Sequence, residues 1–359
     1  MDFGLSEEQR LLQDTVKAFV ADACPAPRLR ELFEAGAESD VALWRGLSEL
    51  GVAGLAVPEA YGGAGLEILD LALAAEALGH AAFPGPFLGH ALAGLALAAG
   101  GSPAQQERWL PKLATGDVVA TLAFGEAQGG FEPEDWTPVA SAGRLTGSKA
   151  WVPCAGAADL FVVGVVGGGL VLVERSAPGV EIARVDGIDR TRPLSALRFA
   201  GAPCDPLAGG EAAARRVRDA GLVLLAADAF GAAEKLLALA IAYAQTREQF
   251  GQPIAQFQAV KHQLANLATA IEPMRALVWY AAHAQGHMAD DAERSAAIAK
   301  AHVTDQALDA AREVVQLHGG IGFTWDCDVQ IWLKRALFDR AFLGTPERHR
   351  ERQAALAGW

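Results

Sequence analysis

The first third of the chain has an apolar pattern typical of helices. Ser6 with Gln9 makes a candidate capping box, and apolar residues then recur at steps of three and four, as at Leu12, Val16 and Val20. Further stretches with this pattern follow at residues 41–50, 66–78 and 86–99, and a helix start with proline in its first turn follows at 102–103. We therefore expect a helical region from residue 1 to about 117, interrupted by a glycine-dense loop at 58–65.

The pattern changes between residues 118 and 206. Short runs rich in branched residues, separated by Gly, Pro and Asp, occur at 118–124, 160–166, 170–173, 180–185 and 194–199. They predict strands of a β-barrel or a sandwich. Because strands and helices do not alternate here, a doubly wound dinucleotide-binding sheet is not expected.

From residue 207 the pattern is helical again, and the predicted helices are long. One apolar stripe runs from Phe257 to Val278 and another from Ala299 to Leu317, as in antiparallel helix packing. Pro273 interrupts the first stripe and predicts a kink. We expect three domains, at residues 1–117, 118–206 and 207–359, in a mainly α protein of the α+β class.

Composition narrows the function. The 359 residues are 52% hydrophobic and carry a net charge of −13, which argues against nucleic acid or anionic lipid as a partner. The most apolar stretch, residues 221–244, contains Asp228, Glu234 and Lys235, so no membrane span is expected. The chain start lacks the pattern of a secretory signal. Four scattered cysteines and no supported histidine pair fit a cytoplasmic protein without a disulfide frame or metal site.

Some residues are candidates for holding a flavin dinucleotide. Arg247 is suited to clamp a pyrophosphate, Phe250 to shape the adjacent turn, and Gln258 to reach a nucleoside. Gly319-Gly320 would let backbone approach phosphate oxygens, and Trp151 offers a flat wall for the flavin ring.

Each candidate also has an ordinary structural explanation. Gly319-Gly320 follows a helix, where glycine is the commonest cap. Arg247 alone is a solvated charge at a helix end, and Trp151 alone is a core residue. Only their conjunction favours a cofactor site.

Four motifs, spread over all three regions, resemble the acyl-CoA dehydrogenase family. They are Pro58-Glu-Ala-Tyr-Gly-Gly-Ala-Gly-Leu66, Gly147-x-Lys149-x-Trp151, Thr246-Arg-x-x-Phe-Gly-x-Pro-Ile254 with Phe257-Gln258, and Gln316-x-x-Gly-Gly-x-Gly-Phe-Thr324. The resemblance implies a helical N-terminal domain, a middle β-barrel and a C-terminal four-helix bundle. It also implies FAD bound at the subunit interfaces of a dimer or tetramer, with the 316–324 loop reaching a neighbouring subunit's flavin. An acyl-CoA substrate and electron-transfer flavoprotein, or a similar acceptor, are the implied partners. The residues implied to contact FAD are Phe124, Trp151, Arg247, Phe250, Gln258, Gln316, Gly319, Gly320 and Thr345.

The catalytic base of that family is missing at its usual positions. In most members a Glu precedes a Gly-Thr pair, and here Leu343 precedes Gly344-Thr345. In others the base lies on the first long bundle helix, at a position that aligns with Gly221. Leucine and glycine cannot accept the proton beside a thioester carbonyl. Three acids are candidates to replace the base, although each is also explained as an ordinary surface charge: Asp219, Glu126 and Glu347.

These departures resemble the base-lacking subunit of mixed assemblies, such as those similar to steroid side-chain dehydrogenases. We therefore expect a hetero-oligomer whose partner carries the base. Two alternatives stay open: a structural subunit that has lost flavin, and a flavin oxidase or monooxygenase of the same fold.

Overall fold

The computed structural model describes residues 4–36 and 39–359. The chain divides into two compact units. Unit 1 consists of Met1–Arg30, Ala72–Phe83 and Leu222–Trp359, and unit 2 of Glu31–Leu71 and Pro84–Gly221. Helices α2 (Ala26–Ala35), α4 (Ile68–His80) and α7 (Gly210–Thr246) each contribute to both units. The division into three domains expected from the sequence stays a prediction.

Where the structure describes unit 1, its regular elements are helices and one small hairpin. It contains α1 (Glu7–Ala23), the greater part of α7, α8 (Gln258–His287), α9 (Ala289–His318), α10 (Val329–Ala341) and α11 (Pro346–Leu356). The Ser6 hydroxyl accepts from the Gln9 backbone N–H, and the Gln9 side chain accepts from the Ser6 backbone N–H, which confirms the capping box.

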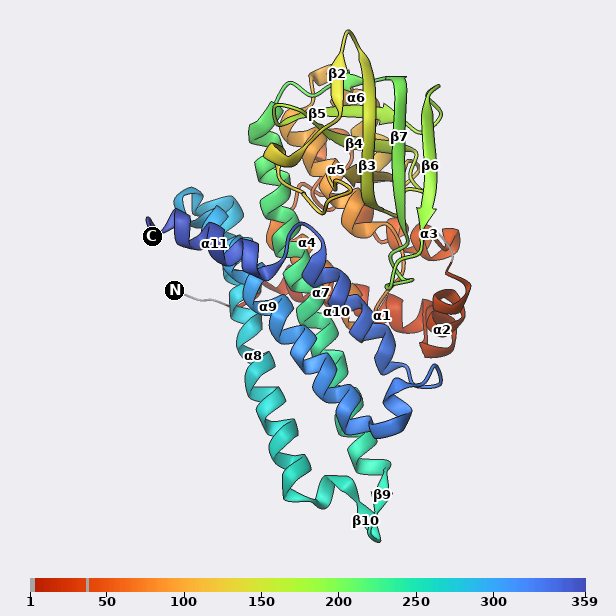
Figure 1. Ribbon diagram of the computed structural model, residues 1–359, viewed down its shortest axis with the longest axis vertical. Coiled ribbons are helices and arrows are strands. Elements are labelled where there is room, and N and C mark those ends of the chain that lie inside the picture. Colours follow the sequence, from red (N-terminus) through yellow and green to blue (C-terminus); the bar gives the residue numbers. More distant parts are fainter. Residues whose placement is uncertain (1–3, 37–38) are drawn as a thin grey trace. The chain divides into compact units, whose positions relative to one another are not determined.

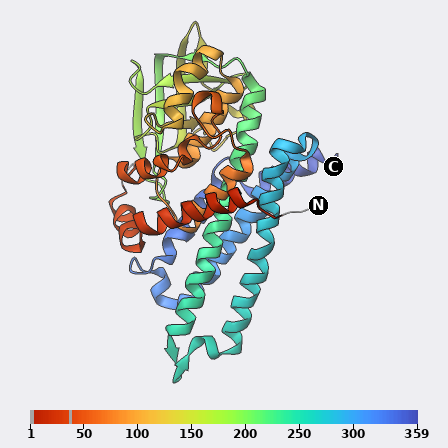
Figure 2. The ribbon, with the colours of Figure 1, turned by 180° about the vertical axis from the view of Figure 1, so that it is seen from behind.

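The long helices of unit 1 form the expected bundle. Helix α9 packs against α8, α10 and α11, and it buries Val303, Ala307 and Val314 of the predicted stripe (Figure 1). Seen from behind, α1 crosses α7 (Figure 2). Helix α8 runs without interruption from Gln258 to His287 through Pro273. Among the described residues no helix is long and apolar enough to cross a membrane.

Unit 2 combines short helices with the strands. Its helices are α3 (Val41–Glu49), α5 (Phe87–Gly100) and α6 (Pro103–Ala114), with 3-10 turns at Val52–Gly54, Glu59–Tyr61 and Pro133–Asp135. Ser102 caps α6 through a capping box with Gln105, and Pro103 occupies its first turn, as the sequence predicts.

The strands of unit 2 form two four-stranded sheets around one core. The first has the order β1 (Ala120–Ala123), β4 (Leu160–Val165), β5 (Gly169–Glu174), β8 (Asp205–Pro206), with β1 parallel to β4. The second is antiparallel, with the order β2 (Val139–Ser141), β3 (Arg144–Pro153), β7 (Leu194–Pro203), β6 (Val180–Val185). Both sheets contribute to the apolar core, for example Phe161 and Val173 from the first and Leu145 and Phe199 from the second. The predicted strand region between residues 118 and 206 is confirmed, and its strands form two sheets.

Strands β2 and β3 are both missing from the periodicity-based prediction. Strand β3 carries Gly147 and Lys149 among its apolar residues, and only part of it alternates between buried and exposed positions. Its pairing with β7 has register shifts near Thr146 and between Lys149 and Val152. These irregularities break the period of two by which strands are recognised.

Candidate functional site

In unit 1, most of the predicted cofactor residues lie at one end of the helix bundle. There the last turns of α7 and α9 meet: the Tyr243 hydroxyl donates to the His318 carbonyl at 3.2 Å, and their rings stack at 4.3 Å. Arg247 follows Tyr243 by one helical turn, and Gly319-Gly320 follow His318 directly. Two motifs some 70 residues apart are therefore brought together within one chain (Figure 1).

A tight hairpin projects from this end. Strands β9 (Glu248–Gln249) and β10 (Gln252–Pro253) are joined by the two-residue turn Phe250-Gly251, with φ of 54° and 79°. A turn with both φ values positive favours Asn-Gly, and a bulky residue in its first position costs about 1–2 kcal/mol. Phe250 is nonetheless there and is 93% exposed. Its ring meets that of Phe257 edge to face at 6.1 Å, and this contact leaves most of the Phe250 side chain open to a ligand or a partner surface.

The twin glycines have different local roles. Gly319 adopts φ 66° and ψ −144°, a conformation nearly confined to glycine. Gly320 has no positive φ. A Cβ added at either residue would meet nothing within 4 Å. Neither backbone strain nor packing within the chain therefore requires glycine at 320, and its open face suits the approach of a ligand to the backbone.

The charges at this end fit an anionic ligand. Arg247 is exposed, and it forms no ion pair with any residue that the structure describes. Gln258, at the start of α8, and Gln316, in the last turn of α9, are also exposed. A guanidinium, two side-chain amides and bare backbone next to a flat aromatic ring are suited to the pyrophosphate and nucleoside of a dinucleotide such as FAD.

The remaining flavin candidates of the β region lie in unit 2. Trp151 is 36% exposed, has φ of 57°, and donates from its indole nitrogen to the Glu126 carbonyl at 3.2 Å. Phe124 is buried against Trp136, with ring centroids 4.7 Å apart. Phe124 is therefore a core residue of this region, while the Trp151 side chain is partly open to solvent.

Leu343 occupies a buried corner between α10 and α11. Its side chain is fully buried and its φ is 58°, in the left-handed region. His349 donates from Nε2 to the Leu343 carbonyl at 2.9 Å, which holds the corner in place. Thr345, the N-cap of α11, is exposed. The backbone at this corner is well defined, but the side chain of Leu343 cannot accept a proton.

The three acidic candidates are all engaged by cations. Asp219 is buried and accepts from Arg218 at 2.8 Å, and Arg218 also binds Glu132 at 3.1 Å. Glu126 is buried and accepts from Lys149 at 2.6 Å.

Glu347 is exposed and pairs with Arg340 at 2.6 Å. A hydrogen bond from Thr345, with the helix N-terminus and Arg340, lowers the pKa of Glu347 to about 2. A base for a weakly acidic C–H needs a raised pKa, so Glu347 has the wrong electrostatic environment.

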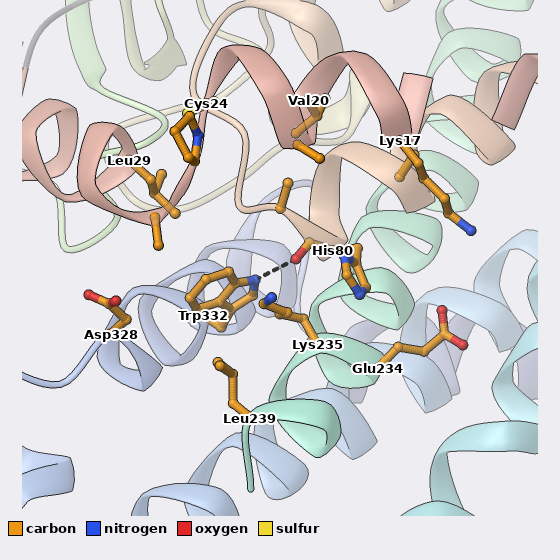
Figure 3. A pocket seen from close by; sticks show the side chains of 15 residues that line it. Lys17, Val20, Cys24, Leu29, His80, Glu234, Lys235, Leu239, Asp328 and Trp332 are labelled. Atoms are coloured by element: carbon orange, nitrogen blue, oxygen red, sulfur yellow. Dashed lines mark hydrogen bonds between the residues drawn. The ribbon is translucent and has the colours of Figure 1, made fainter. Parts of the chain in front are cut away.

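A separate cavity of about 710 Å³ lies in unit 1 among α1, α2, α4, α7 and α10 (Figure 3). Its wall includes Lys235, which lies over the Trp332 ring, and the Trp332 indole donates to the His80 carbonyl at 3.1 Å. Its two carboxylates, Glu234 and Asp328, are paired with Arg275 and Arg30, both at 2.7 Å. None of the candidate cofactor or catalytic residues lines this cavity.

Sequence reasoning missed the residues that hold the site together. Tyr243 and His318 join the two motifs. Tyr243 precedes its motif, and His318 occupies an unspecified position within the 316–324 motif, so the sequence marked neither residue. The spacing of Tyr243 four residues before Arg247 was an available signal, because it places both near one face of the last helical turns. Lys149 was noticed only as part of a motif, and its buried ion pair had no sequence signal.

Comparison with known proteins identifies the families of two parts of the chain. Residues 6–117 match the acyl-CoA dehydrogenase N-terminal domain, and residues 210–357 match the acyl-CoA dehydrogenase C-terminal domain. Acyl-CoA dehydrogenase IpdE2 of Mycobacterium tuberculosis is 34% identical over 341 residues, covering 95% of this chain and 94% of the relative.

Solved structures are similar over the whole chain. A Tcur3481-Tcur3483 steroid ACAD variant superposes with a TM-score of 0.91 and 32% identity, covering 98% of both chains. The ChsE4-ChsE5 complex of Mycobacterium tuberculosis has a TM-score of 0.90 and 29% identity, covering 100% of this chain and 99% of the other. The chain belongs to the acyl-CoA dehydrogenase family of oxidoreductases.

Proposed function

We propose that this chain takes part in FAD-dependent α,β-dehydrogenation of an acyl-CoA thioester as the base-lacking subunit of a hetero-oligomer. The observation that carries the proposal is the bundle end where Arg247, Phe250 and Gly319-Gly320 meet, exposed and tied together by Tyr243 and His318. This arrangement has a cation and open backbone suited to a dinucleotide, and Arg247 forms no ion pair with any residue that the structure describes.

In this assignment Arg247 binds the pyrophosphate, and the N–H groups near Gly320 approach its oxygens. Gln258 and Gln316 contact the nucleoside, and Phe250 shields it from water. When bound, FAD supplies the acceptor for the hydride that leaves the β-carbon of the substrate. Trp151 and Thr345 are assigned to flavin contacts on the basis of the family motifs, and Phe124 to support of the Trp151 region.

The assignment of the base-lacking role depends on Leu343 and Gly221. The α-proton has no acceptor at Leu343, and Asp219, Glu126 and Glu347 are each bound to a cation. A partner subunit would therefore supply the carboxylate. Two similar structures support this assembly, since each is named for a pair of proteins: the ChsE4-ChsE5 complex and the Tcur3481-Tcur3483 steroid ACAD. By family resemblance, electron-transfer flavoprotein or a similar protein is the proposed acceptor.

The test is expression of the chain alone and together with a base-carrying homologue. The mixed complex should be yellow, absorb near 450 nm as flavins do, and bleach anaerobically with acyl-CoA, while the chain alone should show little turnover. A colourless mixed complex would support a structural subunit without flavin. Bleaching that reverses rapidly with O₂ would instead support an oxidase.

Arg247→Ala isolates the pyrophosphate contact. Loss of a charged hydrogen bond worth about 1.5–3 kcal/mol should weaken FAD binding by at least about tenfold, measured by flavin release during dialysis. Lys261→Ala is the matched control, because Lys261 is an exposed cation near the start of α8 and has no proposed contact. Equal FAD retention in both variants would remove Arg247 from the site.

A further inference from the structure

The carboxylate of Glu126 lies at the centre of a buried polar cluster in unit 2. It accepts from Lys149 Nζ at 2.6 Å, from the Thr137 backbone N–H at 3.1 Å and from the Thr137 hydroxyl at 2.7 Å. The Lys149 side chain is completely buried and that of Glu126 is 5% exposed. A carboxylate with this many donors in a dry environment is held in one orientation.

The same residue holds the loop after β1 against strand β3 through its backbone. The Glu126 carbonyl accepts from the Trp151 indole at 3.2 Å, and the Gly125 carbonyl accepts from the Ala150 backbone N–H at 2.8 Å. A Cβ at Gly125 would lie 2.4 Å from the Ala150 carbonyl oxygen, so this close approach requires glycine. Residues 125–126 and 150–151 are thus joined outside the regular ladder of the sheet.

Lys149 connects this junction to the aromatic residues beneath it. Its ammonium lies 5.0 Å from the centre of the Trp136 ring, and it also donates to the Phe124 carbonyl at 3.4 Å. Burial lowers the pKa of Lys149 to about 8, although the Glu126 carboxylate opposes this shift. The lysine therefore remains an ammonium at neutral pH, and the interaction with Glu126 is a buried ion pair.

Trp151 needs such support because its conformation is unfavourable. Its φ of 57° places an aromatic residue in the left-handed region, and the register of β3 with β7 shifts between Lys149 and Val152. Positive φ in a bulky residue persists only where surrounding contacts hold it. The contacts that do so here are the indole bond to Glu126 and the anchoring of Glu126 by Lys149 and Thr137.

We propose that Glu126 and Lys149 are positioning residues that fix the Trp151 ring for contact with the flavin. This inference rests on the proposed function, because it deepens the assignment of Trp151 to the flavin. It also gives Glu126 a role other than that of the missing base. Breaking one member of the pair leaves a buried charge without its partner, and the loop at 125–126 must then rearrange.

The experiment compares Lys149→Met and Glu126→Gln with an exposed ion pair on the same sheet. Arg198→Met breaks the Arg198–Glu181 pair between β7 and β6, whose side chains are 65% and 60% exposed. The chain is labelled with 5-fluorotryptophan, and the Trp151 signal is assigned by its loss in Trp151→Phe. In the flavin-free chain, Lys149→Met and Glu126→Gln should shift or broaden the Trp151 signal, and Arg198→Met should not.

The second readout is the flavin in the mixed complex. Lys149→Met should change the absorption maximum or reduction potential of the flavin and weaken its binding by about tenfold. An unchanged Trp151 signal together with an unchanged flavin potential, even with a lower Tm, would overturn the proposal by showing a purely structural pair. Should Lys149→Met not fold, the double variant Glu126→Gln/Lys149→Met, which buries no charge, carries the same test.

The two readouts separate this inference from the proposed function. A shifted Trp151 signal in a chain whose mixed complex never takes up flavin would support the coupling of the pair to Trp151 and refute the flavin assignment. A normal flavin complex with an unaffected Trp151 signal would refute the positioning role alone.

Discussion

At the scale of single residues, substitutions at the adjacent Gly319 and Gly320 should separate effects on stability from effects on FAD binding. Gly319 needs its left-handed conformation, so Gly319→Ala should lower the free energy of unfolding by about 1–3 kcal/mol. Gly320 has an open Cβ direction and no positive φ, so Gly320→Ala should change stability by less than about 0.5 kcal/mol. If backbone at Gly320 approaches the dinucleotide, this stable variant should still bind FAD more weakly. Urea unfolding measures the stability of both variants, and flavin titration measures their FAD binding. If Gly320→Ala bound FAD as tightly as wild type, the FAD phosphates would not lie against the Gly320 backbone.

Leu343 is the residue whose replacement tests the missing base. The side chain is fully buried in a left-handed corner, so Leu343→Glu should destabilise the chain by more than about 2 kcal/mol. The corner is packed for leucine, and we expect no dehydrogenation by the homo-oligomer of this variant. Leu343→Gln controls for polarity without charge. Acyl-CoA-dependent dye reduction by Leu343→Glu but not by Leu343→Gln would show that the chain's own pocket is competent and lacks only the carboxylate.

At the scale of elements, His90 links helix α5 to helix α6 and strand β1 by hydrogen bonds that require a neutral imidazole. Its Nε2 donates to the Leu113 carbonyl at 3.0 Å, and its Nδ1 accepts from the Ala120 backbone N–H at 3.4 Å. Burial lowers the pKa of His90 to about 4, against the model-peptide value of 6.5. Protonation of Nδ1 would place a second donor against the Ala120 N–H, and it would give the buried ring a positive charge.

The pH dependence follows from these pKa values. Because the folded pKa lies below the unfolded one, the unfolded chain binds this proton first as pH falls. The contribution of His90 should be complete above pH 6.5 and should fall by roughly 3 kcal/mol towards pH 4. Urea unfolding of wild type and His90→Gln from pH 7 to pH 4 measures this, since the variant should lose less stability over that range. Parallel curves would mean that His90 is not held neutral.

The sequence predicts an element correctly where its apolar residues keep one regular spacing. It fails where a side chain is placed for a local interaction and breaks that spacing. The apolar stripe of α9 was predicted because its helical spacing is regular, and the start of α1 was predicted because a capping box precedes residues with helical spacing. The periodicity missed strand β3 because Gly147 and Lys149 break its alternation, and the side chain of Lys149 is buried in its ion pair with Glu126. Phe250 and Trp151 have positive φ values that no propensity predicts. The individual motif residues were predicted from resemblance, whereas the Tyr243–His318 contact that joins two of the motifs needed the structure.

At the scale of the whole molecule, the bundle end carries an unusual group of exposed apolar side chains. Phe250, Phe323, Trp325 and Ile321 are 93%, 80%, 55% and 47% exposed, and all lie on the hairpin or on the turn after α9. Single exposed apolar residues are common, but a group of them marks an interaction surface. We expect a partner subunit to cover this group next to the dinucleotide.

Phe323→Ser tests this assembly without altering a proposed cofactor contact. An aromatic side chain buried at an interface contributes about 1.5–3 kcal/mol, so the variant should raise the subunit dissociation constant by about tenfold or more. Sedimentation of the mixed complex over a range of concentrations measures the change. Trp359→Ser is the control, because Trp359 is 94% exposed at the chain terminus and lies outside the group. If the two variants had equal dissociation constants, the partner subunit would not cover the bundle end. The dinucleotide would then not be bound between two subunits at this place.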